Sequence, residues 1–313
     1  MKTWERGRLA RIRSILFASV LTLIVVALFA PPQNGSTGQA QYTKATPEWN
    51  QPVKPFRIIG NIYYVGASEV SSFLITTPGG HILLDSGFAE TVPLIVEGVK
   101  QLGFKFEDVK ILINSHAHYD HAAGLAEIKR LTGAQLMLSE ADAGLVANGG
   151  KGDFQWGDTF TYEPAKADRI LQDKERVELG GVTMTARLTP GHTKGCTTWL
   201  MQVKEDGRSY DVVFVGSTTA PGYNLVDNPK YPNIATDYEY TFRLLRTFPC
   251  DVFLAPHGSF FGLNEKAQRL ARGERPSPFV DPKGYRDFLD WTEKDFVNLL
   301  LSKQKIAIPK KNP

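Results

Sequence analysis

Four side chains of types that bind metal ions fall within six residues of this sequence, in the segment His-Ala-His-Tyr-Asp-His at positions 116–121. Imidazole nitrogens and carboxylate oxygens are ligands that zinc accepts in proteins. An apolar, β-branched run at 109–113 precedes the segment, and an apolar pattern with helical spacing follows it and ends at Gly133. We therefore predict a strand, a ligand-bearing loop and a helix, an arrangement in which a rigid scaffold holds the reactive groups.

Two further histidines occupy the same kind of position. His192 lies in the run Thr-Pro-Gly-His-Thr and His257 in Ala-Pro-His-Gly, and each follows an apolar strand-like segment at a Pro/Gly turn. The chain has six histidines, so five of them lie on three predicted strand-end loops. This concentration favours a metal site over a chance His-rich surface loop. The sixth, His81, lies within a strand-like run, and we predict a structural role for it.

Six candidate ligands are too many for one catalytic zinc ion, which takes about three protein ligands and keeps a position open. We therefore predict two zinc ions. The first would be bound by His116, His118 and His192, and the second by Asp120, His121 and His257. Paired metals about 3.5–4 Å apart can share a hydroxide that forms at neutral pH, because metal binding lowers the pKa of water to about 7. Hydrolysis would then need no side-chain nucleophile.

The bulk composition is that of a globular protein, with 42% hydrophobic and 11% aromatic residues. The formal net charge is +3, but residues 1–40 contribute a net +4, which leaves about −1 for the remainder. A remainder without a basic field is not expected to bind nucleic acid.

Residues 1–40 have the pattern of a secretory signal peptide. Basic residues precede an apolar run at 15–30, and a Gly/Ser/Gln-rich spacer ends in the small-x-small sequence Gly38-Gln39-Ala40. The apolar run is close to the roughly 17 residues that can span a bilayer, so an uncleaved anchor is the alternative. In either case we expect residues 41–313 to fold outside the cytoplasm, in the periplasm, as a monomer that contacts no membrane beyond this segment.

Periodicity predicts an α/β chain in which strands and helices occur in two runs. Strands are expected at 56–65, 71–77, 81–85, 109–113 and 135–138, and then at 169–172, 176–179, 182–188, 197–203, 210–215 and 252–255. Helices are expected at 90–103, 122–131, 140–146, 237–247 and 282–303. Two sheet-plus-helix halves packed face to face form a four-layer αββα sandwich, which we predict as a single domain. The glycine-rich segment 148–166 breaks the pattern and is predicted to be a mobile loop or a cover over the ligand.

The motifs at 116–121 and 191–193 resemble those of the metallo-β-lactamase superfamily, His-x-His-x-Asp-His and Gly-His-Thr. Many members carry a further aspartate that bridges the two metals at the end of a strand, where this chain reads Val-Phe-Val-Gly-Ser with Ser217 last. A serine cannot bridge two cations as a carboxylate does. The chain resembles instead the third subclass of class B β-lactamases, which lack this bridge, and the resemblance runs through most of the mature chain.

This resemblance implies a metallo-β-lactamase fold and hydrolysis of the β-lactam amide of penicillins, cephalosporins or carbapenems by a zinc-bound hydroxide. Asp120 would act in catalysis by binding the second zinc ion and helping to orient the nucleophile. Two alternatives from other classes stay open. The chain could be another hydrolase of the superfamily, such as a lactonase or a thioester hydrolase, or a non-catalytic zinc-binding envelope protein.

The resemblance also implies substrate-binding residues. Ser217 and Thr219 would contact the substrate carboxylate, although hydroxyls in this position also fit simple turn chemistry. Phe154 and Trp156 would form the apolar side of the substrate groove, with packing into the core or under a lid as the alternative. Tyr223 would lie on the side of the substrate carbonyl.

The sequence departs from the family pattern beside His192. Lys194 and Cys196 stand where relatives commonly have Pro and Ser after Gly-His-Thr. Cys196 is expected to be either a buried structural thiol or a soft ligand that competes for the metal. Cys250 is the second cysteine of the chain, and the sequence does not decide whether the two form a disulfide.

Overall fold

The computed structural model describes residues 46–307, and the predicted signal peptide or anchor at 1–40 lies outside them. The described residues belong to one compact unit, as the prediction of a single catalytic domain requires. Within them, no helix is long and apolar enough to cross a membrane.

The first sheet has seven strands in the order β1 to β7. They are β1 (Phe56–Ile59), β2 (Ile62–Tyr64), β3 (Phe73–Thr77), β4 (Gly80–Leu84), β5 (Val109–Ile113), β6 (Gln135–Ser139) and β7 (Arg169–Leu171). The first four strands pair antiparallel, whereas β4 to β7 pair parallel. Because parallel strands end at the same edge of a sheet, the segments that follow β4, β5 and β6 are brought together.

The second sheet has five strands in the order β12-β11-β10-β9-β8. They are β8 (Arg176–Leu179), β9 (Val182–Leu188), β10 (Thr197–Glu205), β11 (Arg208–Phe214) and β12 (Val252–Leu254). Strands β8 to β11 form antiparallel pairs, and β12 runs parallel to β11. The sequence grouped the strand expected at 169–172 with the second run of strands. This grouping was wrong, because β7 pairs with β6 in the first sheet and not with the strands that follow it.

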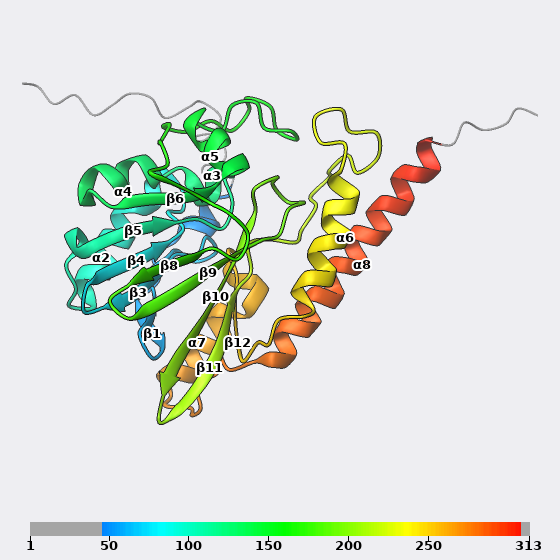
Figure 1. Ribbon diagram of the computed structural model, residues 1–313. Helices are drawn as coiled ribbons and strands as arrows, with labels where there is room; N and C mark the ends of the chain where they lie inside the picture. Colours follow the sequence, from blue (N-terminus) through cyan, green and yellow to red (C-terminus); the bar gives the residue numbers. More distant parts are fainter. Residues whose placement is uncertain (1–45, 308–313) are drawn as a thin grey trace, which may run out of the picture. The chain divides into compact units, whose positions relative to one another are not determined.

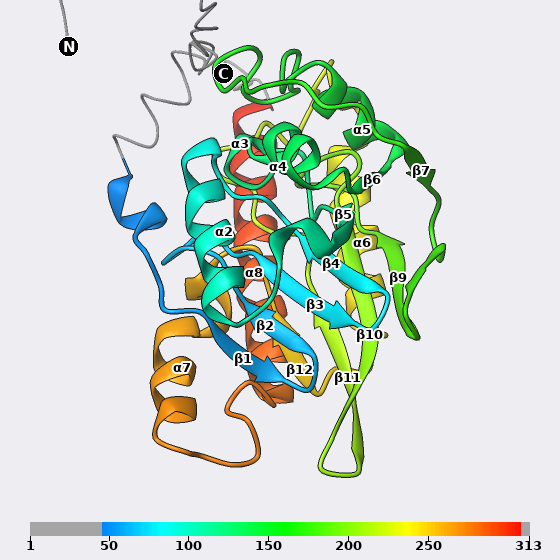
Figure 2. The same ribbon diagram turned by 90° about the vertical axis from the view of Figure 1, so that its left-hand side faces the viewer.

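Helices cover the outer faces of the two sheets, which gives the predicted four-layer sandwich (Figures 1 and 2). The helices are α2 (Val92–Gln101), α3 (Tyr119–Ala122), α4 (Leu125–Thr132), α5 (Glu140–Ala147), α6 (Ile234–Leu245), α7 (Leu263–Ala271) and α8 (Pro282–Ala307). Helices α2 to α5 lie on the side of the first sheet, and α6 and α8 lie beside the second (Figure 1). Helix α7 was not expected from the sequence.

Apolar side chains fill the spaces between these layers. One core lies between the sheets, where the rings of Phe73 on β3 and Phe214 on β11 pack edge to face with centroids 5.3 Å apart. A second core lies between the first sheet and α2 to α5. In β5 every side chain except Lys110 is buried, as a parallel strand covered on both faces requires.

The helix expected after the histidine segment is interrupted at Gly124, which separates α3 from α4. A Cβ atom at this position would lie 2.8 Å from the carbonyl oxygen of Ser86, so only glycine permits this close approach of the two loops. The approach holds the short α3, with its histidine and aspartate side chains, against the end of β4. Helix α4 ends as predicted at Gly133, whose φ of +67° is the left-handed conformation of a helix C-cap.

Candidate metal centre

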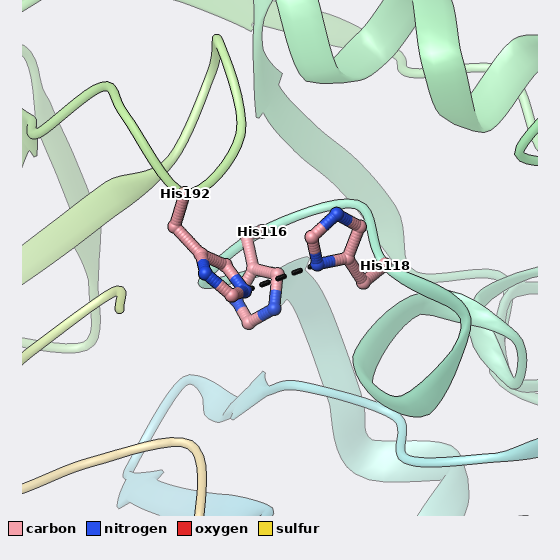
Figure 3. A group of neighbouring side chains, drawn as sticks. All are labelled: His116, His118 and His192. Carbon is pink, nitrogen blue, oxygen red and sulfur yellow. Dashed lines mark hydrogen bonds between the residues drawn. The ribbon is translucent and has the colours of Figure 1, made fainter. Parts of the chain in front are cut away.

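The six predicted ligands lie on three loops that meet at one edge of the two sheets. The ligand positions are His116 in the loop after β5, His118 just before α3, Asp120 and His121 within α3, His192 between β9 and β10, and His257 after β12. The fold thus brings a contiguous segment of the first half of the chain together with single residues from the second half. Figure 3 shows the side chains of His116, His118 and His192 converging from two of these loops.

The first group of side chains presents three ring nitrogens to one another. Nδ1 of His118 lies 3.0 Å from Nε2 of His192, and both rings pack edge-on against the ring of His116 (Figure 3). One ligand atom from each of these three residues lies within 4.8 Å of the others. This spacing suits three imidazoles around one cation.

The second group combines a carboxylate with two ring nitrogens. Oδ2 of Asp120 lies 3.3 Å from Nε2 of His121 and 3.6 Å from Nε2 of His257, and the two nitrogens are 3.3 Å apart. His116 also has a ligand atom within 4.8 Å of those of Asp120 and His121. The sequence prediction assigned His116 to the first group alone, whereas the structure places it beside both.

Each ring nitrogen that faces away from the first group lies near an oxygen atom, in two cases at hydrogen-bond distance. Nδ1 of His116 lies 3.2 Å from the carbonyl oxygen of Gly216, and Nδ1 of His192 lies 2.7 Å from that of Thr219. Nε2 of His118 faces the carboxylate of Asp153 at 3.6 Å. Partners of this kind set the tautomer and the orientation of a metal-binding imidazole.

In the second group, carboxylates face the outward ring nitrogens of the two histidines. Nδ1 of His121 lies 3.8 Å from Oδ2 of Asp85, and Nδ1 of His257 lies 3.8 Å from Oε1 of Glu69. Glu69 also accepts hydrogen bonds from the backbone nitrogen of Ser259, at 3.1 Å, and from its hydroxyl. These contacts leave the Nε2 atoms of both histidines directed towards Asp120.

The pKa values are those of a site that is incomplete without a cation. Burial lowers the pKa of His116 and of His192 well below the ordinary value, and burial with the neighbouring His121 lowers that of His257 to about 3. Burial also opposes charge on His121, but the carboxylates of Asp120, Asp85 and Glu69 together outweigh it and raise the pKa of His121. Neutral imidazoles carry the free lone pair that binds a metal. The buried Nε2 of His116 has no hydrogen-bond partner among residues 46–307, so the donor set fits a metal ion.

Asp142, which was not predicted as a site residue, ties two of the ligand loops together. This buried carboxylate accepts hydrogen bonds of 2.9 Å from the backbone nitrogens of Ala117 and Gly195 and from the hydroxyl of Thr193. It therefore joins the loop of His116 and His118 to the loop of His192. Its sequence context, a helix after β6, gives no sign of this role.

Asp85, after the end of β4, also holds a ligand loop in place through hydrogen bonds. Its Oδ1 accepts hydrogen bonds from the backbone nitrogen of Ser115, at 2.6 Å, and from the side-chain amide of Asn114, at 2.7 Å. The carbonyl oxygen of Asn114 in turn accepts a 3.0 Å bond from the indole of Trp199 on β10. The start of the ligand loop is thus fixed to both sheets.

A cavity of about 630 Å³ opens beside the two groups. It is lined by Trp49, Glu69, His118, Tyr119, Asp120, Trp156, Phe160, His192, Thr219, Pro221, Tyr223, His257, Ser259 and Phe260. Of the predicted substrate-binding residues, Trp156, Thr219 and Tyr223 are among these. Ser217 and Phe154 are not.

Ser217 and Phe154 lie just behind the cavity wall. The hydroxyl of Ser217 is buried 3.5 Å from that of Thr219, and the ring of Phe154 packs edge-on against Tyr223 and Tyr231. Phe154 therefore supports the wall that Tyr223 forms. The hydroxyl of Tyr223 donates a 3.1 Å hydrogen bond to the carbonyl oxygen of His192.

Several cavity residues were not among the predicted substrate-binding residues. Trp49 comes from the segment before β1, and its ring packs edge-on against His257 at 5.1 Å. Phe260 packs against the same imidazole at 4.9 Å. The position of Phe260 three residues after His257 was a usable signal, whereas nothing near Trp49 in the sequence marks it as part of a site.

The remaining expectations concern residues near or away from the site. Cys196 and Cys250 are both free thiols, and burial raises the pKa of each. Cys196 is fully buried, with Sγ 3.7 Å from the carbonyl oxygen of Ser217, as a structural thiol would be. Lys194 lies at the surface over the ring of Tyr231. His81 lies on β4 and packs edge-on against Phe104, in the structural role predicted for it.

Known proteins share both the sequence pattern and the fold. Residues 65–257 match the family model of the metallo-beta-lactamase superfamily. Native FEZ-1 metallo-beta-lactamase from Legionella gormanii is 45% identical with a TM-score of 0.80, and the match covers 82% of this chain and 98% of that one. BJP-1, a subclass B3 metallo-beta-lactamase of Bradyrhizobium japonicum, is 35% identical with a TM-score of 0.79, over 84% of this chain and all of that one.

Curated relatives match over shorter stretches. A probable metallo-hydrolase of Burkholderia pseudomallei is 30% identical over 114 residues, which is 35% of this chain and 38% of the relative. The N-acyl homoserine lactonase AttM of Rhizobium radiobacter is 29% identical over 158 residues, or 43% of this chain and 60% of the relative. The family match covers more than half of this chain. The similarity to class B3 structures agrees with the subclass that the motifs predicted. The chain belongs to the metallo-beta-lactamase superfamily, and its close structural similarity to the class B3 enzymes supports a metal-binding hydrolase of that type.

Proposed function

We propose that this chain is a zinc-dependent hydrolase that opens the amide of β-lactams, whether penicillins, cephalosporins or carbapenems. The observation that carries the proposal is the pair of ligand groups, each with its ring nitrogens turned inward, beside a cavity of about 630 Å³. That volume lies within the range of sites for small molecules. Similarity to FEZ-1 and BJP-1 over nearly their whole length supports the substrate class.

Two zinc ions fit the donor atoms. Nε2 of His116, Nδ1 of His118 and Nε2 of His192 would hold one ion, and Oδ2 of Asp120 with Nε2 of His121 and of His257 would hold the other. When bound, zinc supplies a Lewis acid that polarises a carbonyl group and lowers the pKa of water to about 7. Imidazole and carboxylate ligands without thiolates suit this metal.

The other residues would orient water and substrate. The carboxylate of Asp120 accepts a hydrogen bond from the attacking water and directs it towards the carbonyl carbon. Thr219, with Ser217 behind it, offers hydroxyl donors to the substrate carboxylate. Trp156 lines the cavity and would contact the body of the substrate. Tyr223 is fully buried in the cavity wall and would hold the loop of His192 through its hydroxyl, and Phe154 keeps Tyr223 in place.

A lactonase is the alternative that the similarity to AttM raises. Ser217 speaks against it, since the lactonase branch of the family is expected to bridge its metals with a carboxylate at this position. Parallel assays of an acyl homoserine lactone and a penicillin would separate the two, and faster turnover of the lactone would overturn the proposal.

The decisive assay uses purified protein with zinc and a chromogenic cephalosporin. We expect hydrolysis that a chelator abolishes and added zinc restores. Absence of turnover of any β-lactam, with zinc bound in stoichiometric amount, would instead favour a non-catalytic zinc-binding protein.

We also propose that the chain works in the periplasm, which rests on the signal-like pattern at 1–40, and that it acts as a monomer. Cell fractionation tests the location, and light scattering of the purified mature protein tests the oligomeric state. Recovery of the protein in the cytoplasm, or as a stable oligomer, would contradict them.

A further inference from the structure

One exposed tryptophan adjoins the cavity. Trp291 on α8 is 47% exposed, and its ring centroid lies 5.9 Å from that of Phe260, which lines the cavity. The other exposed large aromatic residue of the described chain is Tyr240 on α6, at 41%, and it does not line this cavity. An exposed indole beside a ligand cavity differs from a scattered surface residue, because it extends the apolar wall of the cavity to the surface.

The ring of Trp291 is held in place from below. Phe288, one turn earlier on α8, is buried and lies 6.0 Å from Trp291 and 5.3 Å from Phe260, measured between ring centroids. Phe260 in turn packs edge-on against His257 at 4.9 Å. Aromatic rings therefore run in an unbroken series from a proposed zinc ligand to the protein surface.

We propose that Phe260 and Trp291 form an aromatic shelf that binds an aromatic or bulky apolar substituent of the substrate outside the cavity. The inference rests on the proposed β-lactam hydrolysis and adds a specificity determinant to it. Trp49 supports the same preference, since its ring also packs against His257, at 5.1 Å, and lines the cavity. A tryptophan with two stiff side-chain torsions offers a large contact area at little cost in entropy.

A purely structural role makes a different prediction. If Trp291 only covers Phe260 and Phe288, its loss would lower thermal stability and would affect all substrates alike. If it contacts the substrate, its loss would affect only those with a substituent long enough to reach the shelf. The ratio of the kcat/KM values of two substrates, measured on one variant, separates these cases. A change in metal content or in the active fraction of the protein alters both values equally and cancels in the ratio.

The experiment compares two penicillins with the same bicyclic nucleus, one acylated with phenylacetic acid and the other with acetic acid. We expect the ratio of their kcat/KM values to fall about threefold to tenfold in Trp291→Ala, the range typical of one aromatic pair. Trp291→Phe should retain most of the ratio because a ring remains, and Tyr240→Ala is the matched control that should leave it unchanged. Circular dichroism and zinc content establish that each variant is folded.

The outcomes distinguish this inference from the proposed function. Turnover of both penicillins with an unchanged ratio in Trp291→Ala overturns the shelf and leaves the hydrolase intact. If Trp291→Ala does not fold, an unchanged ratio in Trp291→Leu, which keeps bulk but no ring, has the same meaning. Failure of the unmodified protein to hydrolyse any β-lactam, including the chromogenic cephalosporin, would overturn the proposed function itself.

Discussion

The two groups of candidate ligands are held by different means. In the group of His116, His118 and His192, two of the outward ring nitrogens contact backbone carbonyl oxygens, which move only if the loops move. In the group of Asp120, His121 and His257, the outward nitrogens face carboxylates at 3.8 Å, and one ligand is itself a carboxylate. The first group is therefore fixed by the fold, whereas the second depends on charged side chains. We expect the second group to be the more easily disturbed.

His116→Ala should have the largest effect, because His116 lies within reach of both groups. Loss of metal from both would remove several kcal/mol of transition-state stabilisation, so we expect kcat/KM for a cephalosporin to fall about 10³-fold or more. Zinc content measured beside activity tests the reason. A variant that kept two zinc ions and near-normal turnover would show that His116 is not a ligand.

Asp120→Asn should weaken zinc binding in the second group and leave the first group unaffected. The amide has nearly the shape of the carboxylate but carries no charge, so the second group loses its anionic ligand while the first keeps its three imidazoles. We expect about one zinc ion per chain and a fall in kcat/KM of about a hundredfold. Equal loss of both metals would show that the groups are not independent.

Glu69→Gln should sharpen the same contrast with a smaller effect. It removes the charge that faces Nδ1 of His257 and leaves the first group untouched. We expect the affinity for the second zinc ion to fall about tenfold in a zinc titration, with the first unchanged. The matched control is Glu178→Gln, an exposed carboxylate paired with Arg176 on β8, which should alter neither affinity.

His81→Ala should have the smallest effect on catalysis. The ring of His81, on β4, packs against Phe104 and lies away from both groups. We therefore expect kcat/KM to stay within about twofold while the free energy of unfolding falls by about 1 kcal/mol. Thermal denaturation and the cephalosporin assay measure the two effects. A severe loss of activity in this variant would mean that the ligand assignment is wrong.

Local patterns in the sequence predicted much of this fold. The strand β5, the helix α5 and the C-cap at Gly133 follow from apolar spacing and from glycine. Helix α7 was not predicted, although Leu263, Ala267 and Leu270 recur at the spacing of one helix face. The sheet that contains β7 could not be predicted, because pairing with β6 depends on contacts distant in the sequence.

The site was predictable where chemistry leaves a mark on the sequence. The chain has six histidines, and the strand-end positions of five of them, with Asp120 among them, gave the six residues that the structure brings together. Asp142 and Glu69 carry no such mark, because a buried or half-buried carboxylate looks like any other until its hydrogen-bond partners are placed. The part of the cavity wall that Trp49 forms likewise depends on how separate loops approach each other.

Zinc content and β-lactam turnover measured on one preparation address the two-group arrangement itself. We expect two zinc ions per chain, bound with unequal affinity. We also expect hydrolysis of a cephalosporin that is lost on chelation and regained with zinc. A preparation that hydrolyses β-lactams fully after chelation, or that binds a single zinc ion at saturation, would contradict it.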